Sequence, residues 1–362
     1  MGDFTTTLKG EDGSKVVIKH GATIVATGGR EYRGEEYGYT ESARVVSGLQ
    51  FEALLAKCSR KRVKLDDKTK ATWKLLDEAP PDEVLMIQCV GPAEETCART
   101  CCTTALKQAL KLKALNPEAR LVMLHRDMRT YGFKERLYKQ ALDSGVIFVR
   151  YDPAHKPQVQ VAADGALQVN VRDPVLGAPL NFEPDLLVLS TPLVPAEDSK
   201  ALATKLKVPV DLDGWFLEAH VKLRPVDFSS EGVFLAGAAH YPKLLDETIV
   251  QAQAAAARAA TVLSRQTLNA GGSVARVDPE ACVGCLTCVR ICPYGVPQMQ
   301  IDFTGAGGIV GAAYIEPAVC QGCGTCVAEC PAYAIELLHY RHEQLEDEVG
   351  ALFEAQIQAQ EG

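Results

Sequence analysis

The residues best suited to chemistry are two runs of cysteines near the carboxyl end of the sequence. Each run has the spacing Cys-x2-Cys-x2-Cys-x3-Cys-Pro, and the two runs contain Cys282, Cys285, Cys288 and Cys292, and Cys320, Cys323, Cys326 and Cys330. Three thiolates on one tight loop suit one face of a four-iron cluster, and the proline after the fourth cysteine turns the chain away. Structural zinc prefers two separated Cys-x2-Cys pairs, so this spacing favours [4Fe-4S] clusters over zinc or a disulfide scaffold.

The pairing of the runs follows the rule for two-cluster ferredoxins, in which the fourth cysteine of each run binds the cluster of the other run. We therefore predict two ligand sets. The first set is Cys282, Cys285, Cys288 and Cys330, and the second set is Cys320, Cys323, Cys326 and Cys292. Gly284, Gly322 and Gly324 let the backbone pass close to each cluster. A two-cluster, α+β ferredoxin domain is expected at residues 276–340.

A second concentration of cysteines lies earlier, within fourteen residues: Cys89, Cys97, Cys101 and Cys102. Cys97 and Cys101 are four residues apart and would share one face of a helix, whereas Cys89 would end a strand that faces the start of that helix. The positive end of a helix stabilises an anionic cluster. Buried structural thiols are the alternative, but four cysteines in so short a stretch favour a third cluster.

The same cysteines indicate what the surrounding domain does not bind. Strands are predicted at 84–90, 120–125, 146–151 and 185–191, with a hairpin through Asp164-Gly165 and helices at about 97–114 and 134–143. This alternation predicts a small doubly wound α/β sheet. In a pyridine-nucleotide domain the first strand would run into GxGxxG, but cysteines occupy that turn. NAD(P) binding at this position is therefore disfavoured.

Two flanking stretches are typical of the flavin-binding domain of flavin disulfide reductases. A buried strand at 22–26 ends in Thr27, Gly28 and Gly29, and a strand at 232–235 runs into Ala236, Gly237 and Ala238 before an alanine-rich helix that ends near residue 264. Backbone N–H groups in such turns can contact the flavin nucleotide; a plain strand-end turn is the alternative. Residues 41–80 are predicted to be helical and charged. The glycines at 304–313 are interpreted as a turn between two strands.

Composition excludes several functions. The net charge of −8 argues against nucleic-acid binding. No apolar run reaches the roughly 18 residues of a membrane span. Thirteen cysteines with metal spacing indicate a reducing, cytoplasmic location.

The carboxyl-terminal tail is predicted to form a helix, because Leu345, Val349, Leu352, Phe353 and Ile357 recur at helical spacing. This helix is expected to pack on its own protein, with partner docking as the alternative.

Taken together, these motifs resemble the A subunit of heterodisulfide reductase. The resemblance extends through nearly all of the chain and rests on GATIVATGG, QCVG, CARTCCTTALKQAL, FLAGAAHYPK and both ferredoxin runs. It implies that Cys89, Cys97, Cys101 and Cys102 bind a [4Fe-4S] cluster near FAD. It also implies that Lys107 lies near the flavin, with Lys243 as a second candidate. A lysine beside the flavin ring would stabilise the reduced, anionic form.

The resemblance implies an oxidoreductase subunit that passes electrons between FAD and three [4Fe-4S] clusters, in electron bifurcation or confurcation. Members of the family begin with a GxGxxG segment, which these residues lack. We therefore expect a split FAD site, completed by a GxGxxG-containing flavoprotein. That partner would lie in a complex with proteins like the B and C subunits of heterodisulfide reductase, or with hydrogenase- or dehydrogenase-linked subunits. A flavin-free relay and scaffold subunit is the alternative.

The expected architecture is a partial Rossmann-type FAD domain with an inserted α/β domain, followed by the ferredoxin domain. The predicted boundaries are 1–80 for the partial FAD domain and linker, 81–195 for the insertion, 196–275 for the return to the FAD domain, 276–340 for the ferredoxin domain and 341–362 for a carboxyl-terminal helix.

Overall fold

The computed structural model describes residues 2–59, 62–267, 273–317 and 319–361, with side chains up to residue 353. The chain forms two compact units, each assembled from separate stretches of sequence. The central unit contains Thr27–Glu197 and Gly237–Ile249, and the terminal unit contains Met1–Ala26, Asp198–Ala236 and Val250–Gly362. The predicted boundary between residues 80 and 81 falls inside the central unit.

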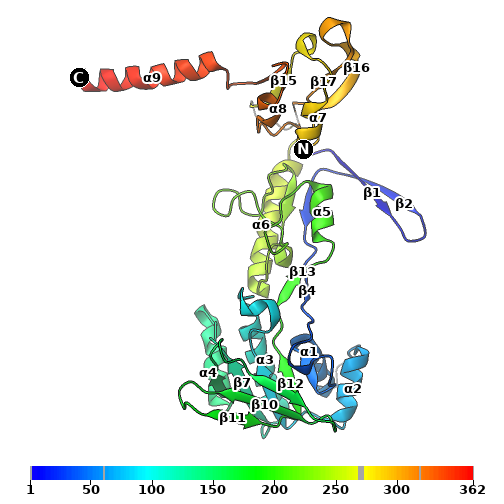
Figure 1. Cartoon of the computed structure of the whole chain (residues 1–362), viewed down its shortest axis with the longest axis vertical. Helices are drawn as coiled ribbons and strands as arrows, with labels where there is room; N and C mark the ends of the chain where they lie inside the picture. Colours follow the sequence, from blue (N-terminus) through cyan, green and yellow to red (C-terminus); the bar gives the residue numbers. More distant parts are fainter. Residues whose placement is uncertain (1, 60–61, 268–272, 318, 362) are drawn as a thin grey trace. The chain divides into compact units, whose positions relative to one another are not determined.

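A five-stranded parallel sheet forms the middle layer of the central unit (Figure 1). Its strands lie in the order β5 (Val45–Ser47), β12 (Leu186–Leu189), β6 (Glu83–Ile87), β7 (Arg120–His125) and β8 (Ile147–Arg150). Every neighbouring pair is parallel. The apolar runs in β6, β7 and β12 are almost entirely buried, as expected for parallel strands covered on both faces.

The two faces of this sheet are covered by different layers. One face packs against helices α1 (Gly48–Cys58), α3 (Cys101–Leu115) and α4 (Glu135–Asp143). The other face packs against an antiparallel sheet of β9 (Gln158–Val161), β10 (Leu167–Arg172) and β11 (Pro179–Phe182). The predicted α/β class is confirmed. The doubly wound prediction is wrong, because the hairpin through Asp164-Gly165 gains a third strand and takes the place of helices on that face.

Residues 41–80 contain helices, as predicted, together with one strand that was not predicted. The sequence predicts helix and charged linker there, but β5 is an edge strand of the parallel sheet, paired with β12. Helix α1 follows β5 directly, and α2 (Asp67–Leu75) comes next. Three residues of β5 are too few for hydrophobic periodicity to distinguish a strand from a helix.

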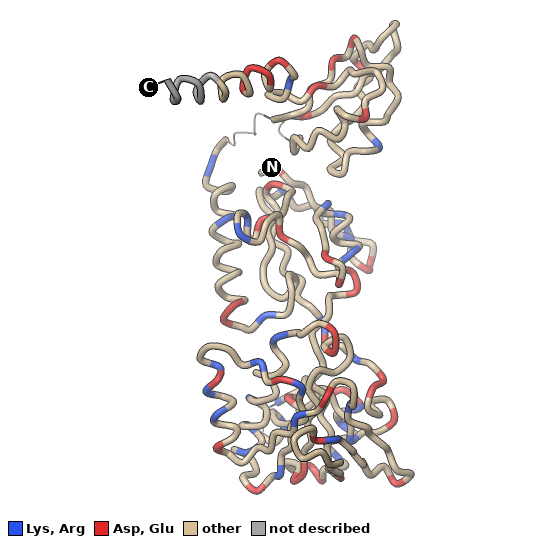
Figure 2. The backbone as a smooth tube through the Cα atoms, turned by 60° about the vertical axis from the view of Figure 1, so that its left-hand side comes forward, with Lys and Arg blue, Asp and Glu red and all other residues tan. Residues whose placement is uncertain are grey.

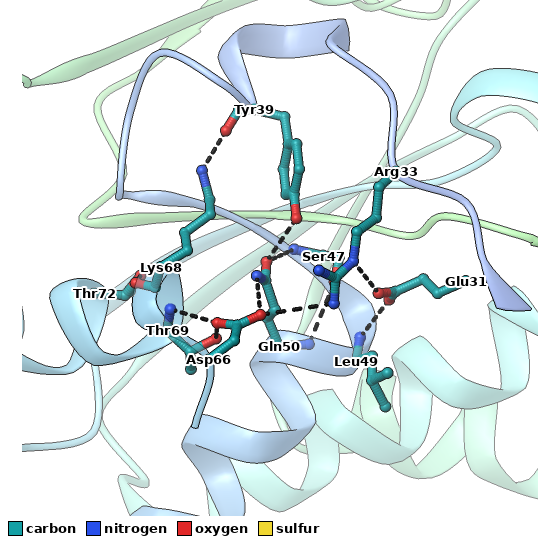
Figure 3. A network of polar contacts seen from close by, with 10 residues as sticks. All are labelled: Glu31, Arg33, Tyr39, Ser47, Leu49, Gln50, Asp66, Lys68, Thr69 and Thr72. Carbon is teal, nitrogen blue, oxygen red and sulfur yellow. Dashed lines mark hydrogen bonds and ion pairs between the residues drawn. The ribbon is translucent and has the colours of Figure 1, made fainter. Parts of the chain in front are cut away.

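A partly buried polar network joins α1 to α2 (Figure 3). The Ser47 hydroxyl accepts the N–H of Gln50 and the Gln50 side chain accepts the N–H of Ser47, which is a capping box for α1. The amide of Gln50 then donates to Asp66 at 2.9 Å. Asp66 caps α2 by accepting the N–H of Thr69 at 2.8 Å. One glutamine therefore fixes the starts of both helices.

The terminal unit begins with a hairpin of β1 (Phe4–Lys9) and β2 (Lys15–His20), followed by β3 (Thr23–Val25). Strand β3 pairs in parallel with β14 (Val233–Leu235), which confirms the strands predicted near 22–26 and 232–235. The predicted alanine-rich helix is α6 (Leu245–Leu263), whose buried face includes Ala255 and Ala259. Helix α5 (Ser199–Leu206) also belongs to this unit.

The ferredoxin part of the terminal unit contains two small antiparallel pairs and two short helices. Its elements are β15 (Ala275–Val277), α7 (Thr287–Ile291), β16 (Gln298–Thr304), β17 (Val310–Tyr314), α8 (Thr325–Ala328) and β18 (Ile335–Leu337). Strand β15 pairs with β18, and β16 pairs with β17. The glycine-rich stretch at 304–313 turns between β16 and β17, as predicted. Between Ser273 and Leu338 the only basic residues are Arg276 and Arg290, so blue is scarce there in Figure 2.

The remaining elements are short or lie at the carboxyl end. Strand β4 (Gly29–Glu31) pairs with β13 (Leu193–Pro195) in the central unit. The 3-10 helices are η1 (Glu36–Gly38), η2 (Gly91–Glu94), η3 (Gly132–Lys134), η4 (Gly237–Ala239), η5 (Pro279–Ala281) and η6 (Ala306–Gly308). Helix α9 (His342–Glu361) forms where the sequence predicts it. Its Leu352 and Phe353 are 69% and 61% exposed, so the expected packing on its own protein is wrong for these side chains. The side chain of Ile357 lies outside those described.

Candidate functional site

The two ferredoxin runs adopt matching local structures. The third cysteine of each run lies in a short helix, Cys288 in α7 and Cys326 in α8, and both are buried. Four backbone N–H groups point at cysteine sulfur at 3.3 to 3.5 Å, namely Ala275 to Cys320, Val296 to Cys292, Ala313 to Cys282 and Ala334 to Cys330. Hydrogen bonds to cysteine sulfur are a feature of iron-sulfur sites, where they tune the reduction potential of the cluster.

The fourth cysteine of the second run approaches the first run. Cys282, Cys285, Cys288 and Cys330 line one apolar recess, to which Met299 and Ile335 also contribute. Burial raises the pKa of Cys288, and the neighbouring thiols of Cys282, Cys285 and Cys330 raise it further. The structure therefore brings the members of the first predicted ligand set together.

The second predicted set is grouped in the same way. Burial raises the pKa of Cys326 to about 11, and the thiols of Cys320, Cys292 and Cys323 add to this effect. Cys288, a member of the first set, also raises the pKa of Cys326, so the two sets are neighbours. All eight cysteines except the exposed Cys285 and Cys323 belong to one hydrophobic cluster of the domain. A raised pKa disfavours free thiolate, but a coordinated thiol is deprotonated outright.

Two glycines make the tight cysteine loops possible. Gly284 and Gly322 each precede a cysteine, and each has a φ of +65°. This left-handed conformation is costly for residues with a Cβ. At Gly322 a Cβ would also lie 2.2 Å from the carbonyl oxygen of Ser273, whereas at Gly284 the nearest atom is 3.7 Å away.

The third group of cysteines gathers at the carboxyl end of the parallel sheet. Cys89 follows β6, Cys97 lies in the turn, and Cys101 and Cys102 are the first residues of α3. The pKa of Cys101 is raised to about 12, first by burial and then by the neighbouring thiols of Cys102, Cys89 and Cys97. Burial also raises the pKa of Cys102, with Cys89 and Cys97 adding to it. The four cysteines that the sequence singles out are thus mutual neighbours.

The surroundings of this group suit bound anionic sulfur. Burial raises the pKa of Cys89, whereas the guanidinium of Arg126, which donates to this thiol, acts in the opposite direction. Arg126 is itself held by the carbonyl oxygens of Glu94 and Ala93, at 2.5 and 3.0 Å. The N–H of Arg99 donates to the sulfur of Cys97 at 3.4 Å.

Single metal ions need closer ligands than a cluster does. In the part of the chain that the structure describes, no group of three or more His, Cys, Asp or Glu side chains is arranged to hold one metal ion. A four-iron cluster spreads its thiolates over separate corners.

A large recess of about 810 Å³ opens beside the third cysteine group, within the central unit. Its wall includes Cys101, Thr104 and Lys107, which follow one face of α3, together with Lys243 and Thr191. The volume is in the range of small-molecule and cofactor sites. The recess therefore has room for a cofactor directly beside Cys101.

The two lysines make the recess partly cationic. The Nζ of Lys107 lies 3.8 Å from the Oε2 of Glu52, and this carboxylate also accepts from Gln108 at 3.3 Å. The ammonium group of Lys243 lies over the ring of Tyr241, 3.0 Å from its centroid. The paired strands β4 and β13 also contribute to the lining, which includes Gly29.

The structure separates the predicted flavin-contacting residues into two groups. Gly29, Lys107 and Lys243 line the recess. The other five, Thr27, Gly28, Ala236, Gly237 and Ala238, are not among its lining residues. The N–H of Ala236 donates to the carbonyl oxygen of Val25 at 2.9 Å, so it extends the pairing of β14 with β3.

Comparisons with known proteins agree with this geometry. Residues 274–297 and 313–336 each match a family described as 4Fe-4S binding domain. The A subunit of H(2):CoB-CoM heterodisulfide,ferredoxin reductase from Methanothermobacter thermautotrophicus is 33% identical over 300 residues. An iron-sulfur A subunit of CoB–CoM heterodisulfide reductase from Methanopyrus kandleri is 34% identical over 368 residues. This chain is a homologue of the heterodisulfide reductase A subunit.

The shared stretch covers most of this chain but only part of each relative. The match spans 80% of the chain and 44% of the Methanothermobacter protein, and 97% of the chain and 52% of the Methanopyrus protein. The chain therefore spans about half the length of the curated relatives that it matches.

Among solved structures, thioredoxin reductase from Lactococcus lactis is 17% identical, with a TM-score of 0.42 over 72% of each chain. None of the helices within the described residues is both long and apolar enough to cross a bilayer.

Several residues at the third cysteine group were not predicted from sequence. Arg126 and Arg99 contact its thiols, and Glu247 joins Arg99 from the first turn of α6. Arg99 lies within the turn Cys97-Ala-Arg-Thr-Cys101, and this closeness in sequence is the signal that was available for its contact with Cys97. Arg126 and Glu247 approach only through the tertiary fold.

Proposed function

We propose that this chain is an electron-transfer subunit of a heterodisulfide-reductase-like oxidoreductase complex in the cytoplasm. In this proposal it binds three [4Fe-4S] clusters and contributes to an FAD site. The first and second ligand sets hold two clusters, and Cys89, Cys97, Cys101 and Cys102 hold the third. The two matches to 4Fe-4S binding domains support the first two clusters. The grouped thiols at the start of α3 support the third.

The recess beside Cys101 is the observation that carries the proposal. Cys101 and Lys107 both belong to α3, and both line the recess. A flavin bound there would be next to the third cluster, so electrons would have a short path between them. An iron-sulfur relay without a flavin would have no need for this recess.

The residues of the recess have distinct roles in this proposal. Bound FAD supplies the exchange between electron pairs and the single electrons that clusters carry. Lys107 and Lys243 line the recess and would supply positive charge to a flavin ring that becomes negative on reduction. Glu52 orients Lys107 through their ion pair. The turn that carries Cys97 and Cys101 keeps the third cluster beside the recess.

The names of the relatives are the basis for the proposed partners. The relatives are named as subunits of heterodisulfide reductases, one of which also reduces ferredoxin. We infer that FAD binding is completed by a GxGxxG-containing segment on a partner. Other redox proteins, like the B and C subunits or a hydrogenase- or dehydrogenase-linked subunit, would exchange electrons with the ferredoxin clusters. Electron bifurcation is then the function of the assembled complex.

The test is the iron and flavin content of the chain purified alone without oxygen. About 12 irons per chain, from three four-iron clusters, with no flavin, would support the third cluster and a shared FAD site. About 8 irons would indicate that the third cysteine group binds no cluster, so that its thiols are structural and the chain is a two-cluster relay. Stoichiometric FAD in the lone chain would refute the shared site while supporting the recess as a flavin site.

Adding a partner that contains GxGxxG would then separate the two candidate functions. Flavin retention by the pair, lost in the variant Lys107→Glu, would support the flavin site. No flavin in the pair would favour a flavin-free relay and scaffold subunit.

A further inference from the structure

Arg99 connects the cysteine turn to the start of helix α6, inside the central unit. Its Nη2 donates to the Oε1 of Glu247 at 2.6 Å and to the hydroxyl of Tyr131 at 2.7 Å. The hydroxyl of Tyr131 also donates to Glu247, at 2.7 Å. The three side chains therefore form a closed, charge-assisted network, and such hydrogen bonds are stronger than neutral ones.

The backbone of Arg99 belongs to the turn that contains two of the proposed cluster ligands. Arg99 has a φ of +62°, an uncommon conformation for a residue with a side chain. Its N–H donates to the sulfur of Cys97, and the carbonyl of Ala98 accepts the N–H of Thr100 at 2.6 Å. A strained backbone needs its surroundings to hold it. The guanidinium network supplies this restraint from outside the turn.

Glu247 transmits the same restraint to the lysine side of the recess. Its second oxygen, Oε2, accepts the N–H of Leu244 at 3.0 Å. Leu244 follows Lys243, and both line the recess. Although burial raises it, the pKa of Glu247 is held below its usual value by hydrogen bonds from Tyr131, Leu244 and Arg99. Glu247 is thus an anion at neutral pH.

We propose that Arg99 and Glu247 are positioning residues that fix the cysteine turn and the Lys243 segment in one arrangement. This inference rests on the proposed function, since it concerns the third cluster and the recess beside it. The ion pair between Arg99 and Glu247 then holds Cys97 at one end, through the N–H of Arg99, and the segment of Lys243 and Leu244 at the other. Movement of either end alters the other.

A second ion pair offers a matched control. Lys134 donates to Asp246 at 2.9 Å, so it also ties the start of α6 to the same unit. Asp246 is 66% exposed, whereas the side chains of Arg99 and Glu247 are 36% and 30% exposed. Exposed ion pairs contribute little because water screens them. The Nζ of Lys134 lies 5.6 Å from the centroid of the Tyr131 ring, but its hydrogen bond goes to Asp246 and not to Glu247. Loss of Lys134 should therefore leave the hydrogen bond between Arg99 and Glu247 in place and the third cluster unchanged.

The experiment compares four variants of the full chain, purified without oxygen: Arg99→Gln, Glu247→Gln, the exchanged pair Arg99→Glu/Glu247→Arg, and Lys134→Gln. Two properties are measured. The first is the midpoint potential of the third cluster, followed by the EPR signal that Cys101→Ser abolishes. The second is amide hydrogen exchange of the segment that contains Leu244.

Opposite shifts of the potential are expected from the two single variants. Loss of the positive charge in Arg99→Gln lowers the potential, and loss of the negative charge in Glu247→Gln raises it. Both single variants should exchange the Leu244 amide on the order of tenfold faster, because its local anchoring is weakened. The exchanged pair should recover most of the protection, and Lys134→Gln should match the wild type.

The inference is overturned if Arg99→Gln retains both the wild-type potential and wild-type exchange, or if Lys134→Gln has the same effects. A wild-type chain with only about 8 irons would refute the third cluster of the proposed function. Exchange at Leu244, with its recovery in the exchanged pair, would then still decide whether Arg99 and Glu247 position the segment.

Discussion

Replacement of Gly322 by alanine should selectively destabilise the second ligand set. Gly322 and Gly284 occupy the same position in the two runs and have the same φ of +65°. Alanine in this left-handed region costs about 1–2 kcal/mol relative to glycine. Gly284→Ala should incur only this cost, because the nearest atom to its new Cβ is 3.7 Å away.

Gly322→Ala adds a steric overlap. Its Cβ would lie 2.2 Å from the carbonyl oxygen of Ser273, which is backbone and has little freedom to move. Overpacking adds about 1–3 kcal/mol, so we expect a total of roughly 2–5 kcal/mol. The displaced strand β15 also supplies the N–H that Ala275 donates to Cys320. The strain should therefore reach the second cluster directly.

The assay is the iron content of the two variants and the temperature at which each loses its cluster absorbance. Gly322→Ala should retain about four irons fewer than the wild type, or lose its second cluster at a lower temperature than Gly284→Ala does. Equal behaviour of the two variants would refute the reasoning, because they differ only in the contact with Ser273.

Three other substitutions test the ligand sets, the recess and the scaffold. Cys330→Ser should leave the same EPR signals as Cys285→Ser; signals matching those of Cys323→Ser would contradict the crosswise sets. Lys107→Met should lower the flavin midpoint potential in the assembled complex by about 30 mV, equivalent to about 1.4 kcal/mol for two electrons, and Lys107→Arg should not. Asp66→Ala should lower the free energy of urea unfolding by about 1 kcal/mol through loss of the α2 cap. Burial raises the pKa of Asp66, but hydrogen bonds from Thr69 and Gln50 outweigh it and lower the pKa below its usual value. Its stabilisation is therefore present above the unfolded pKa and lost as pH falls, so the difference between wild type and variant should shrink below about pH 4.

Local sequence was sufficient to predict those elements that depend on residues close together in the chain. The cysteine runs, the turn after β16 and the start of α3 all depend on residues close together in the chain. The buried strands β6, β7 and β12 are short, continuous apolar runs, and their length favours strands over helices. The crosswise sets join the two separate runs, and they were predicted from the rule for two-cluster ferredoxins rather than from local spacing.

Interactions between distant segments were beyond such reasoning. Arg99 and Glu247 are 148 residues apart, and neither has a local pattern that points to the other. Strand β5 has only three residues, and its assignment depends on pairing with β12. The covering sheet of β9, β10 and β11 could not be distinguished from a surface hairpin, because its role depends on the face against which it packs.

The crosswise grouping of the cysteines has a consequence for maturation of the protein. Each set draws three thiols from one run and one from the other, so the first cluster to form would tie both runs together. Closing a loop costs conformational entropy, and that cost would already have been met when the second cluster forms. Insertion of iron at the two sites should therefore be cooperative, with the half-loaded chain a short-lived species during biogenesis.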